Sequence, residues 1–457
     1  MLSSIRFCLT CSILGLFLAP ALYAQDPTAV DTTVADTIAA APVLKLDSTQ
    51  TLSPKLKELF TELATDETNA GLHLDIAKEY QRLGRPRLAL KQLEESLKHD
   101  GTNMDAMYEK GQLLLHLGKR KSAYETFLAI MRDFKADAYL DRIGSQFASP
   151  YKITQLTSNK FNDAMPSFSP DGGTLIFQSD RNGNWDIFTM NLSQGESSVK
   201  PMTSDDDADE NPAYSPDGRF IVFTSTRDDK STRLYKSREI YFMDRNGKSQ
   251  RRITSSYGGD NWGPQFVDTT TVLFASDRVD LSNKPFWQKG TGLFTIEKSG
   301  SFLFQVYGSD KSAPTDPSLR VNGEELVFAD KVEGEYDIFM GSLDGKGTPA
   351  NLTGAKGNDV QPSLSKNGLF IVYVSDVDGN YEVYRMTADG KDQTRITYDD
   401  GDDVFPKFSP DGTKIVFTSN RTGNYQLYMA SVEESSEIDV AKVVAALEKK
   451  IQTATDD

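Results

Sequence analysis

Pro406-Lys-Phe-Ser-Pro-Asp-Gly412, followed by the apolar triplet Ile415-Val-Phe417, is the stretch that decides the fold, because the same pattern occurs six times. The leading prolines of the six copies are Pro166, Pro212, Pro264, Pro317, Pro362 and Pro406. Successive prolines lie 46, 52, 53, 45 and 44 residues apart. A period of this length, built from short strands, is typical of the blades of a β-propeller. The sequence therefore predicts a six-bladed β-propeller over residues 151–432.

The chemistry of each copy fits one blade. In the Pro-Asp-Gly turn, proline presets φ and glycine accepts a positive φ, so the first strand reverses into the second. The triplets that follow are apolar on both faces, as a strand between two neighbouring blades requires. The first Leu-Thr strand end, at Thr157, precedes the first inner strand, and the last blade stops after its third strand near Val432. We therefore expect residues 151–157 to complete the blade of residues 406–432 and close the ring.

These repeats resemble the TolB-type (PD40) propeller. The likeness is carried by six leading prolines, three full Ser-Pro-Asp-Gly motifs and five Leu-Thr-like strand ends, and it covers about residues 151–432. The WD40 family fits less well, because these residues include no His and no Trp-Asp pair at a strand end. The TolB resemblance implies a periplasmic protein that binds other envelope proteins.

Residues 53–148 have a helical pattern with an internal offset of 34 residues. The offset relates Ala77 to Gly111, Gly84 to Gly118, Ala89 to Ala123 and Leu93 to Phe127. This resembles the tetratricopeptide repeat, a helix hairpin of that period that binds partner proteins. An ordinary helical bundle is the alternative. An apolar stripe predicts one more helix over residues 436–452, so the fold class is all-α helical repeats followed by an all-β six-bladed propeller.

The first 24 residues read as a secretory signal peptide cleaved near Ala24, with Arg6 before an apolar run. A retained membrane anchor is the alternative, but the run is short for a bilayer. Residues 25–52 read as a flexible linker. Both cysteines, Cys8 and Cys11, lie in the signal segment, and export without disulfides favours a bacterial periplasm. A net charge of -16 argues against nucleic acid as a partner.

Acidic residues stand shortly before the leading prolines, in loops expected at one face of the propeller. They are Asp163, Asp209, Asp260, Asp359 and Asp403. Arginines open the hairpins that reach the same face, namely Arg181, Arg227, Arg278 and Arg421. We expect these residues to surround the channel mouth and contribute to partner binding. The alternative is that each acid pairs with an arginine or caps its own loop.

Two enlarged hairpins add aromatic residues to this face. Tyr235 lies in one hairpin, and Phe286 and Trp287 lie in the other, beside basic residues. Such a mixture predicts a rim that contacts a protein, because aromatic residues and arginine are enriched at binding hot spots. The alternative is that Trp287 folds back over its own blade.

We expect no cofactor and no metal. The oxygen-rich hairpins Asp180–Asn184 and Asp376–Asn380 could hold Ca²⁺, but an ordinary hairpin explains the same residues. His73, His99 and His116 all lie in the helical part, so the propeller has no His base. The sequence therefore predicts a non-catalytic, exported scaffold that binds envelope proteins. The alternative is a carbohydrate-active or glycan-binding propeller that uses the acidic mouth.

Overall fold

The computed structural model describes residues 52–456, apart from 134–136, 232–235, 256–258, 281, 283, 285–287, 320–322, 355–356 and 436–439. The predicted signal peptide and nearly all of the predicted linker lie outside the described residues. The described residues fall into two compact units, one before residue 137 and after residue 446, and the other from 137 to 446. In the described part, no helix combines the length and the apolar character needed to cross a membrane.

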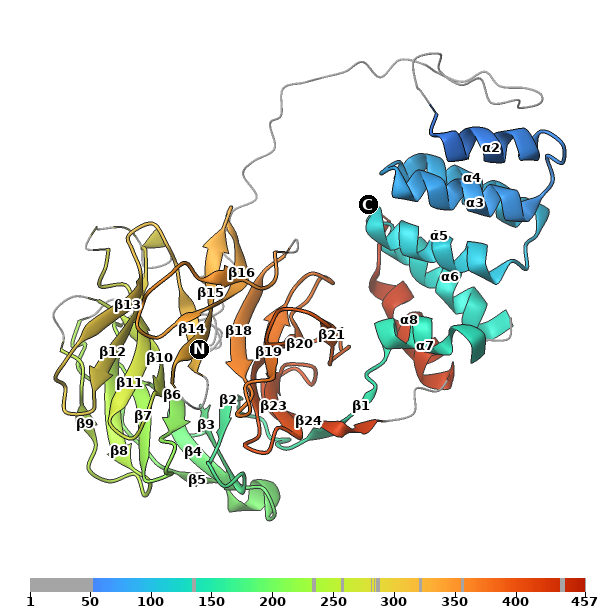
Figure 1. The fold of residues 1–457 in the computed structure, drawn as a ribbon. Helices are drawn as coiled ribbons and strands as arrows, with labels where there is room; N and C mark the ends of the chain where they lie inside the picture. Colours follow the sequence, from blue (N-terminus) through green and yellow to red (C-terminus); the bar gives the residue numbers. More distant parts are fainter. Residues whose placement is uncertain are drawn as a thin grey trace. The chain divides into compact units, whose positions relative to one another are not determined.

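The first unit is helical, which confirms the all-α region of the prediction (Figure 1). Its helices are α2 (Pro54–Leu63), α3 (Ala70–Arg82), α4 (Pro86–His99), α5 (Met104–His116) and α6 (Arg120–Asp133). Helices α3 and α4 pack as one pair and α5 and α6 as another, and the two pairs begin 34 residues apart. The assignment of these pairs to the tetratricopeptide family stays a prediction.

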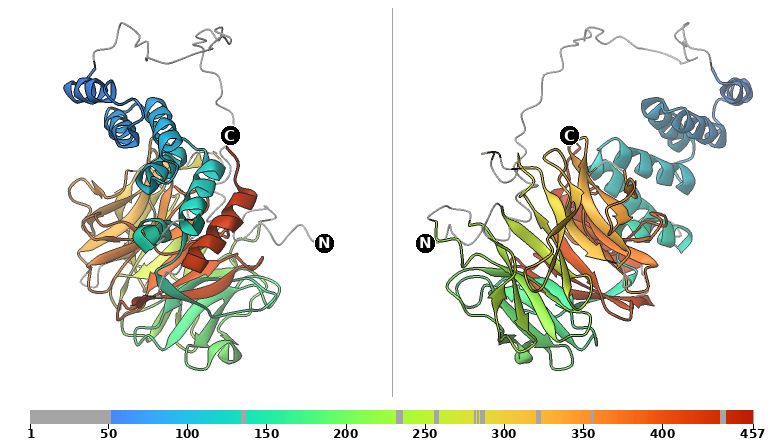
Figure 2. Two further views of the ribbon diagram at one scale, coloured as in Figure 1. Left: turned by 90° about the vertical axis from the view of Figure 1, so that its right-hand side faces the viewer. Right: turned by 60° about the vertical axis from the view of Figure 1, so that its left-hand side comes forward.

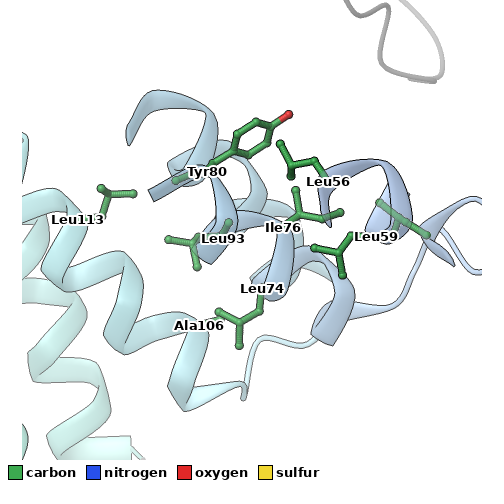
Figure 3. Packing of buried hydrophobic residues seen from close by; sticks show 11 residues of the cluster. Leu56, Leu59, Leu74, Ile76, Tyr80, Leu93, Ala106 and Leu113 are labelled. Carbon is green, nitrogen blue, oxygen red and sulfur yellow. The ribbon is translucent and has the colours of Figure 1, made fainter. Parts of the chain in front are cut away.

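Local chemistry explains where these helices begin and how closely they pack. Asn69 and Asn103 cap α3 and α5, because each side-chain oxygen accepts a backbone N–H three residues on. Leucines and Ile76 of α2 to α5 form the buried core of the unit (Figure 3). At Gly111 a Cβ atom would lie 2.4 Å from the Phe127 ring, so only glycine lets α5 and α6 approach this closely.

The second unit contains six four-stranded antiparallel sheets, which confirms the six-bladed propeller (Figures 1 and 2). The inner strands are β2 (Asp163–Phe168), β6 (Asp209–Tyr214), β10 (Asn261–Phe266), β14 (Thr315–Leu319), β18 (Asp359–Leu364) and β22 (Asp403–Phe408). We number the blades 1 to 6 in this order. The second strands are β3 (Thr174–Ser179), β7 (Phe220–Ser225), β11 (Thr271–Ser276), β15 (Glu325–Val332), β19 (Phe370–Ser375) and β23 (Lys414–Ser419).

The third and outer strands complete each blade. The third strands are β4 (Asp186–Asn191), β8 (Glu239–Asp244), β12 (Gly292–Glu297), β16 (Glu335–Ser342), β20 (Glu382–Thr387) and β24 (Gln426–Ser435). The outer strands of blades 1 to 5 are β5 (Lys200–Pro201), β9 (Arg251–Arg252), β13 (Phe304–Gly308), β17 (Ala350–Asn351) and β21 (Thr394–Arg395). Helices α7 (Asp137–Phe147) and α8 (Val440–Thr453) precede and follow the sheets in the chain.

The ring closes as the sequence predicts. Strand β1 (Tyr151–Gln155) is the outer strand of blade 6, where Ile153 pairs with Ala430 of β24. The inner strands β2 and β22 of the first and last blades are in contact. One blade therefore takes strands from both ends of the propeller sequence, which removes the free sheet edge at the closure.

Each blade is held by an aromatic pair between its second and third strands. In blade 6 the rings of Phe417 and Tyr428 stack with centroids 5.9 Å apart, and in blade 1 those of Phe177 and Phe188 lie 6.2 Å apart. Phe177 and Phe417 are fully buried. Because the second strand is covered by sheets on both faces, its triplet must be apolar throughout.

Candidate functional site

Four of the five predicted acidic residues lie at the first position of an inner strand, and three of these four form buried ion pairs. Asp163 pairs with Arg181 at 2.6 Å, and their counterparts in blades 2 and 6 pair at 2.7 Å. These counterparts are Asp209 with Arg227 and Asp403 with Arg421. The three carboxylates are 0% exposed. The alternative interpretation, an acid paired with an arginine in each blade, therefore describes these three blades.

Each of these arginines also lies over the aromatic pair of its own blade. The guanidinium of Arg421 is 4.5 Å from the centroid of Tyr428 and 5.7 Å from that of Phe417. The backbone N–H of Asp403 donates to the carbonyl of Tyr381 in the preceding blade. The acid therefore joins two blades, while its arginine covers the core of one.

Three blades depart from this pattern, and in blade 4 the inner strand begins at Thr315 in place of an acid. In blade 3, Arg278 donates to the side-chain oxygen of Asn261 at 2.6 Å, and the neighbouring Asp260 pairs instead with Arg238 at 2.6 Å. In blade 5, Val377 follows the hairpin aspartate Asp376 at the position where Arg181 follows Asp180 in blade 1. Burial, together with two nearby aspartate carboxylates, raises the pKa of Asp359 to about 6, while hydrogen bonds from Ser375 and Thr353 oppose the rise.

These observations limit what the predicted partner-binding residues can do. The carboxylates of Asp163, Asp209 and Asp403 are enclosed, so a partner would meet the loops around them rather than the acids themselves. The rim aromatics Tyr235, Phe286 and Trp287 lie outside the described residues. The role of these residues in partner binding stays a prediction.

The two candidate Ca²⁺ hairpins use their polar groups internally. The Asn184 amide donates to two backbone carbonyls at 2.8 Å, and the Asn380 amide donates to two others at 2.9 and 3.0 Å. Asp180 and Asp376 each accept bonds from the asparagine that precedes the inner-strand acid of the same blade. Within the described residues, no group of three or more His, Cys, Asp or Glu is arranged to hold a metal ion.

The propeller instead offers a central cavity of about 340 Å³ that residues of all six inner strands line. Its wall includes Pro170, Pro216 and Pro410 from the Ser-Pro-Asp-Gly turns. None of the predicted acids or hairpin arginines belongs to this wall. The cavity therefore lies toward the ends of the inner strands that carry these turns, away from the face that the sequence indicated.

A repeated backbone kink shapes the wall. The residue before each leading proline has a positive φ between 49° and 59°, and a β-bulge interrupts the pairing there in every blade. These residues are Met165, Asn211, Gly263, Asp316, Gln361 and Phe405. All six line the cavity. A residue before proline normally adopts extended backbone, so the left-handed conformation is strained by about 1–3 kcal/mol for the five that are not glycine.

Side chains of the preceding blade hold several of these kinks. The backbone N–H of Phe405 donates to the side-chain oxygen of Gln361 at 2.7 Å, and that of Asn211 donates to Gln178 at 3.0 Å. In blade 1, Met165 donates to Thr418 at 3.1 Å. The strain at the cavity wall is thus maintained by contacts between blades, an arrangement found at functional sites.

Three charged side chains line this cavity, namely Asp316, Lys407 and the exposed Lys366. Asp316 comes from the kink of β14 in blade 4, and Lys407 follows the leading proline of β22 in blade 6. Burial raises the pKa of Asp316 to about 6, while Lys407 and Arg238 oppose the rise. Burial lowers the pKa of Lys407 to about 8, and the charge of Asp316 opposes that change. Near pH 7 both groups are therefore mainly charged, in a wall that combines prolines and aromatic rings with serine, asparagine and glutamine side chains.

Sequence reasoning missed Asp316 and Lys407 because it read the proline motif only as a strand signal. The six copies nevertheless contain the information. The residue after the leading proline is Ser, Ala or Gln in five blades and Lys407 in the sixth. The residue before it is charged at Asp316 alone. Comparison of equivalent positions would have marked both residues as exceptions.

Comparisons with known proteins agree with the fold. The family model described as the TolB beta propeller domain, PD40, matches residues 127–237 and 377–450. No curated protein matches the sequence.

Solved structures with a similar fold include three of low sequence identity. Oligogalacturonate lyase from Vibrio parahaemolyticus is 14% identical over 62% of this chain and 94% of its own, with a TM-score of 0.42. TolB from Acinetobacter baumannii is 18% identical over 69% and 70%, with a TM-score of 0.41. A gluconolactonase from Xanthomonas campestris is 14% identical over 62% and 89%, with a TM-score of 0.46.

These findings correct one prediction. The expectation that the protein is not an enzyme is wrong as a conclusion, because the propellers of similar fold include a lyase and a lactonase as well as TolB. An enzymatic function is therefore open. The family match and the six described sheets together support a PD40, TolB-like six-bladed β-propeller in the carboxyl-terminal part of the chain.

Proposed function

We propose that this protein is exported to the periplasm and binds partner proteins of the cell envelope, with the propeller cavity as the binding centre. The observation that carries the proposal is the cavity itself, in which Asp316 and Lys407 stay charged without an ion-pair partner among the described residues. Both side chains are partly buried in the wall, and a charge that loses part of its hydration is stabilised by an oppositely charged partner, such as a bound ligand. The helical unit supplies a second surface for protein contacts.

Export is supported by the sequence of residues 1–24, with its short apolar run and small residues near Ala24. The remainder of the chain contains no cysteine. The resemblance to TolB-type repeats adds to this part of the proposal.

An enzymatic function is the second candidate, and the pKa values in the cavity favour it over the acidic mouth. A carboxyl group with a pKa of about 6 and an amine with a pKa of about 8 can both exchange protons near neutral pH, as general acid–base catalysis requires. The mouth carboxylates of Asp163 and Asp403 are already bound to arginines. A carbohydrate-active site would therefore use Asp316 and Lys407.

Site-specific photo-cross-linking in intact cells tests the binding proposal. Benzoylphenylalanine replaces Lys366, an exposed residue of the cavity wall, and in a matched control it replaces Val332, which is 39% exposed on a hairpin outside the wall. We expect a protein adduct of defined mass from position 366 and none from position 332. Adducts from position 332 alone, or none from either position, would contradict the proposal. Turnover of envelope polysaccharides by the purified protein, lost on changing Asp316, would instead establish the second candidate.

A further inference from the structure

The cavity wall holds one carboxylate, Asp316, and two amines, of which Lys407 is partly buried and Lys366 is exposed. Asp316 and Lys407 belong to blades 4 and 6, which blade 5 separates, so the two charges approach the cavity from different sides. No ion pair joins them to each other or to another side chain of the described residues, although the Thr315 hydroxyl bonds to the carboxylate of Asp316. The other titratable groups whose charges interact with Asp316 are Arg238 and Tyr336.

The wall between these charges combines apolar surfaces with serine, asparagine and glutamine side chains. Each blade contributes its leading proline, and the six are Pro166, Pro212, Pro264, Pro317, Pro362 and Pro406. The aromatic rings of Phe168, Phe266 and Phe405 also line the cavity. Proline and backbone-locked kinks lose little conformational freedom on binding, so a ligand that fits meets a preorganised surface.

The size of the cavity limits the ligand. About 340 Å³ lies near the lower end of the roughly 300–1,000 Å³ of small-molecule pockets. A folded domain cannot enter such a space, whereas a short peptide can. A ligand with a single charge would leave the opposite charge of the wall unpaired, at a cost that a ligand with both charges avoids.

From this geometry we propose that the cavity binds a short peptide that carries both an ammonium group and a carboxylate. Asp316 accepts hydrogen bonds from the ammonium, Lys407 donates to the carboxylate, and an apolar side chain of the peptide packs on the prolines. The inference rests on the proposed function in that it uses the same cavity, and it names the chemistry that the cavity recognises.

Calorimetric titration of the purified full chain tests this inference with dipeptide probes. We expect alanyl-phenylalanine to bind, and we expect its N-acetylated form and its carboxamide form each to bind about tenfold or more weakly, because each leaves one charge of the wall unpaired. Asp316→Asn should abolish the discrimination against the acetylated form. Lys407→Met should abolish the discrimination against the amide. Lys414→Gln, which removes an exposed lysine outside the wall, should change neither ratio.

A second probe distinguishes a free peptide from a segment of a partner protein. The end-blocked tripeptide N-acetyl-lysyl-alanyl-glutamyl amide carries both charges on side chains. If the blocked tripeptide binds and the dipeptide does not, the natural ligand is an internal segment of a partner protein. Asp316→Asn and Lys407→Met should then each weaken binding of the tripeptide.

Failure to bind either probe at millimolar concentration would overturn the inference. Binding that ignores both end groups, or selectivity that survives both variants, would also overturn it. Thermal unfolding of each variant shows that the propeller is intact. The photo-cross-link from position 366 does not depend on these peptide probes. Failure of the peptide titrations would therefore refute this inference without refuting the proposed binding of partner proteins.

Discussion

Val377 occupies the place where four other blades carry a hairpin arginine, and its replacement by arginine should stabilise the propeller. The carboxylate that such an arginine would meet is that of Asp359, a residue only 5% exposed. Burial has raised the pKa of this carboxyl from 3.8 to about 6. The two rings on which the guanidinium would pack are present. The ring centroids of Tyr373 and Tyr384 lie 5.7 Å apart, and those of the corresponding pair in blade 6 lie 5.9 Å apart.

The magnitude follows from the pKa. A rise of about two units corresponds to roughly 3 kcal/mol at about 1.4 kcal/mol per unit, and this is an upper bound on what pairing Asp359 can recover. Burying part of the new guanidinium costs some of that energy, so we expect a net gain of about 1–2 kcal/mol. For a unit of this size the gain amounts to roughly 2–8 °C in Tm.

The pH dependence has a definite sign. Because the folded-state pKa of Asp359 is raised, protonation favours the folded state, and this contribution is present below about pH 4 and is lost as the pH rises through about 6. Val377→Arg should lower this pKa and reduce the loss of stability, although burial keeps the pKa of the paired Asp209 and Asp403 raised. Asp359→Asn should remove the loss, because the group no longer titrates.

Thermal unfolding between pH 4 and pH 8 measures these effects in the wild type, in Val377→Arg, in the uncharged control Val377→Gln and in Asp359→Asn. We expect stabilisation by the arginine at pH 7, little at pH 4, and none in the Asp359→Asn background. An equal gain from the arginine with and without Asp359 would refute the reasoning, because the stabilisation would then not come from the ion pair.

Three further predictions concern contacts within the propeller or within the helical unit. Arg421→Met should destabilise the propeller by about 3–5 kcal/mol in chemical denaturation, because it leaves the buried carboxylate of Asp403 without its cation. Thr397→Val should lower the free energy of unfolding by about 1–3 kcal/mol in the same assay, because the Thr397 hydroxyl accepts a backbone N–H and donates to a buried carboxylate, both of β20. An unchanged denaturation midpoint would show that these two bonds do not stabilise the propeller. Gly111→Ala should lower the stability of the helical unit by about 1–3 kcal/mol, followed by the helical circular dichroism signal, because the added methyl group meets the ring of Phe127.

The blade pattern could be predicted from the sequence because its signals are local and repeat. Each Ser-Pro-Asp-Gly turn bonds within itself, as where Ser169 donates to Asp171 at 2.6 Å, so its residues alone determine its shape. Ring closure could be predicted because one strand precedes the first inner strand and the last blade has only three strands of its own. The outer strand of blade 3, β13, was missed because no Leu-Thr pair marks it.

The site was harder to predict because it depends on contacts between distant blades. Asp260 and Asn261 are adjacent in the sequence, and only the folded hairpin shows that Arg238 binds the first and Arg278 the second. The acids of the mouth looked available because their burial is a property of the closed ring. Asp316 was overlooked because the kink that turns it toward the cavity has no local sequence signal other than the proline that follows.

The most direct test of the cavity as the functional centre is the yield of the photo-cross-link from position 366 after both wall charges are removed. Asp316→Asn combined with Lys407→Met should reduce the adduct in intact cells by about tenfold or more, since each charged contact contributes about 1.5–3 kcal/mol. The control Lys414→Gln should leave the adduct unchanged, and all proteins should unfold within a few degrees of one another. An undiminished adduct in the double variant would contradict the account, because the partner would then be held by some other surface of the propeller.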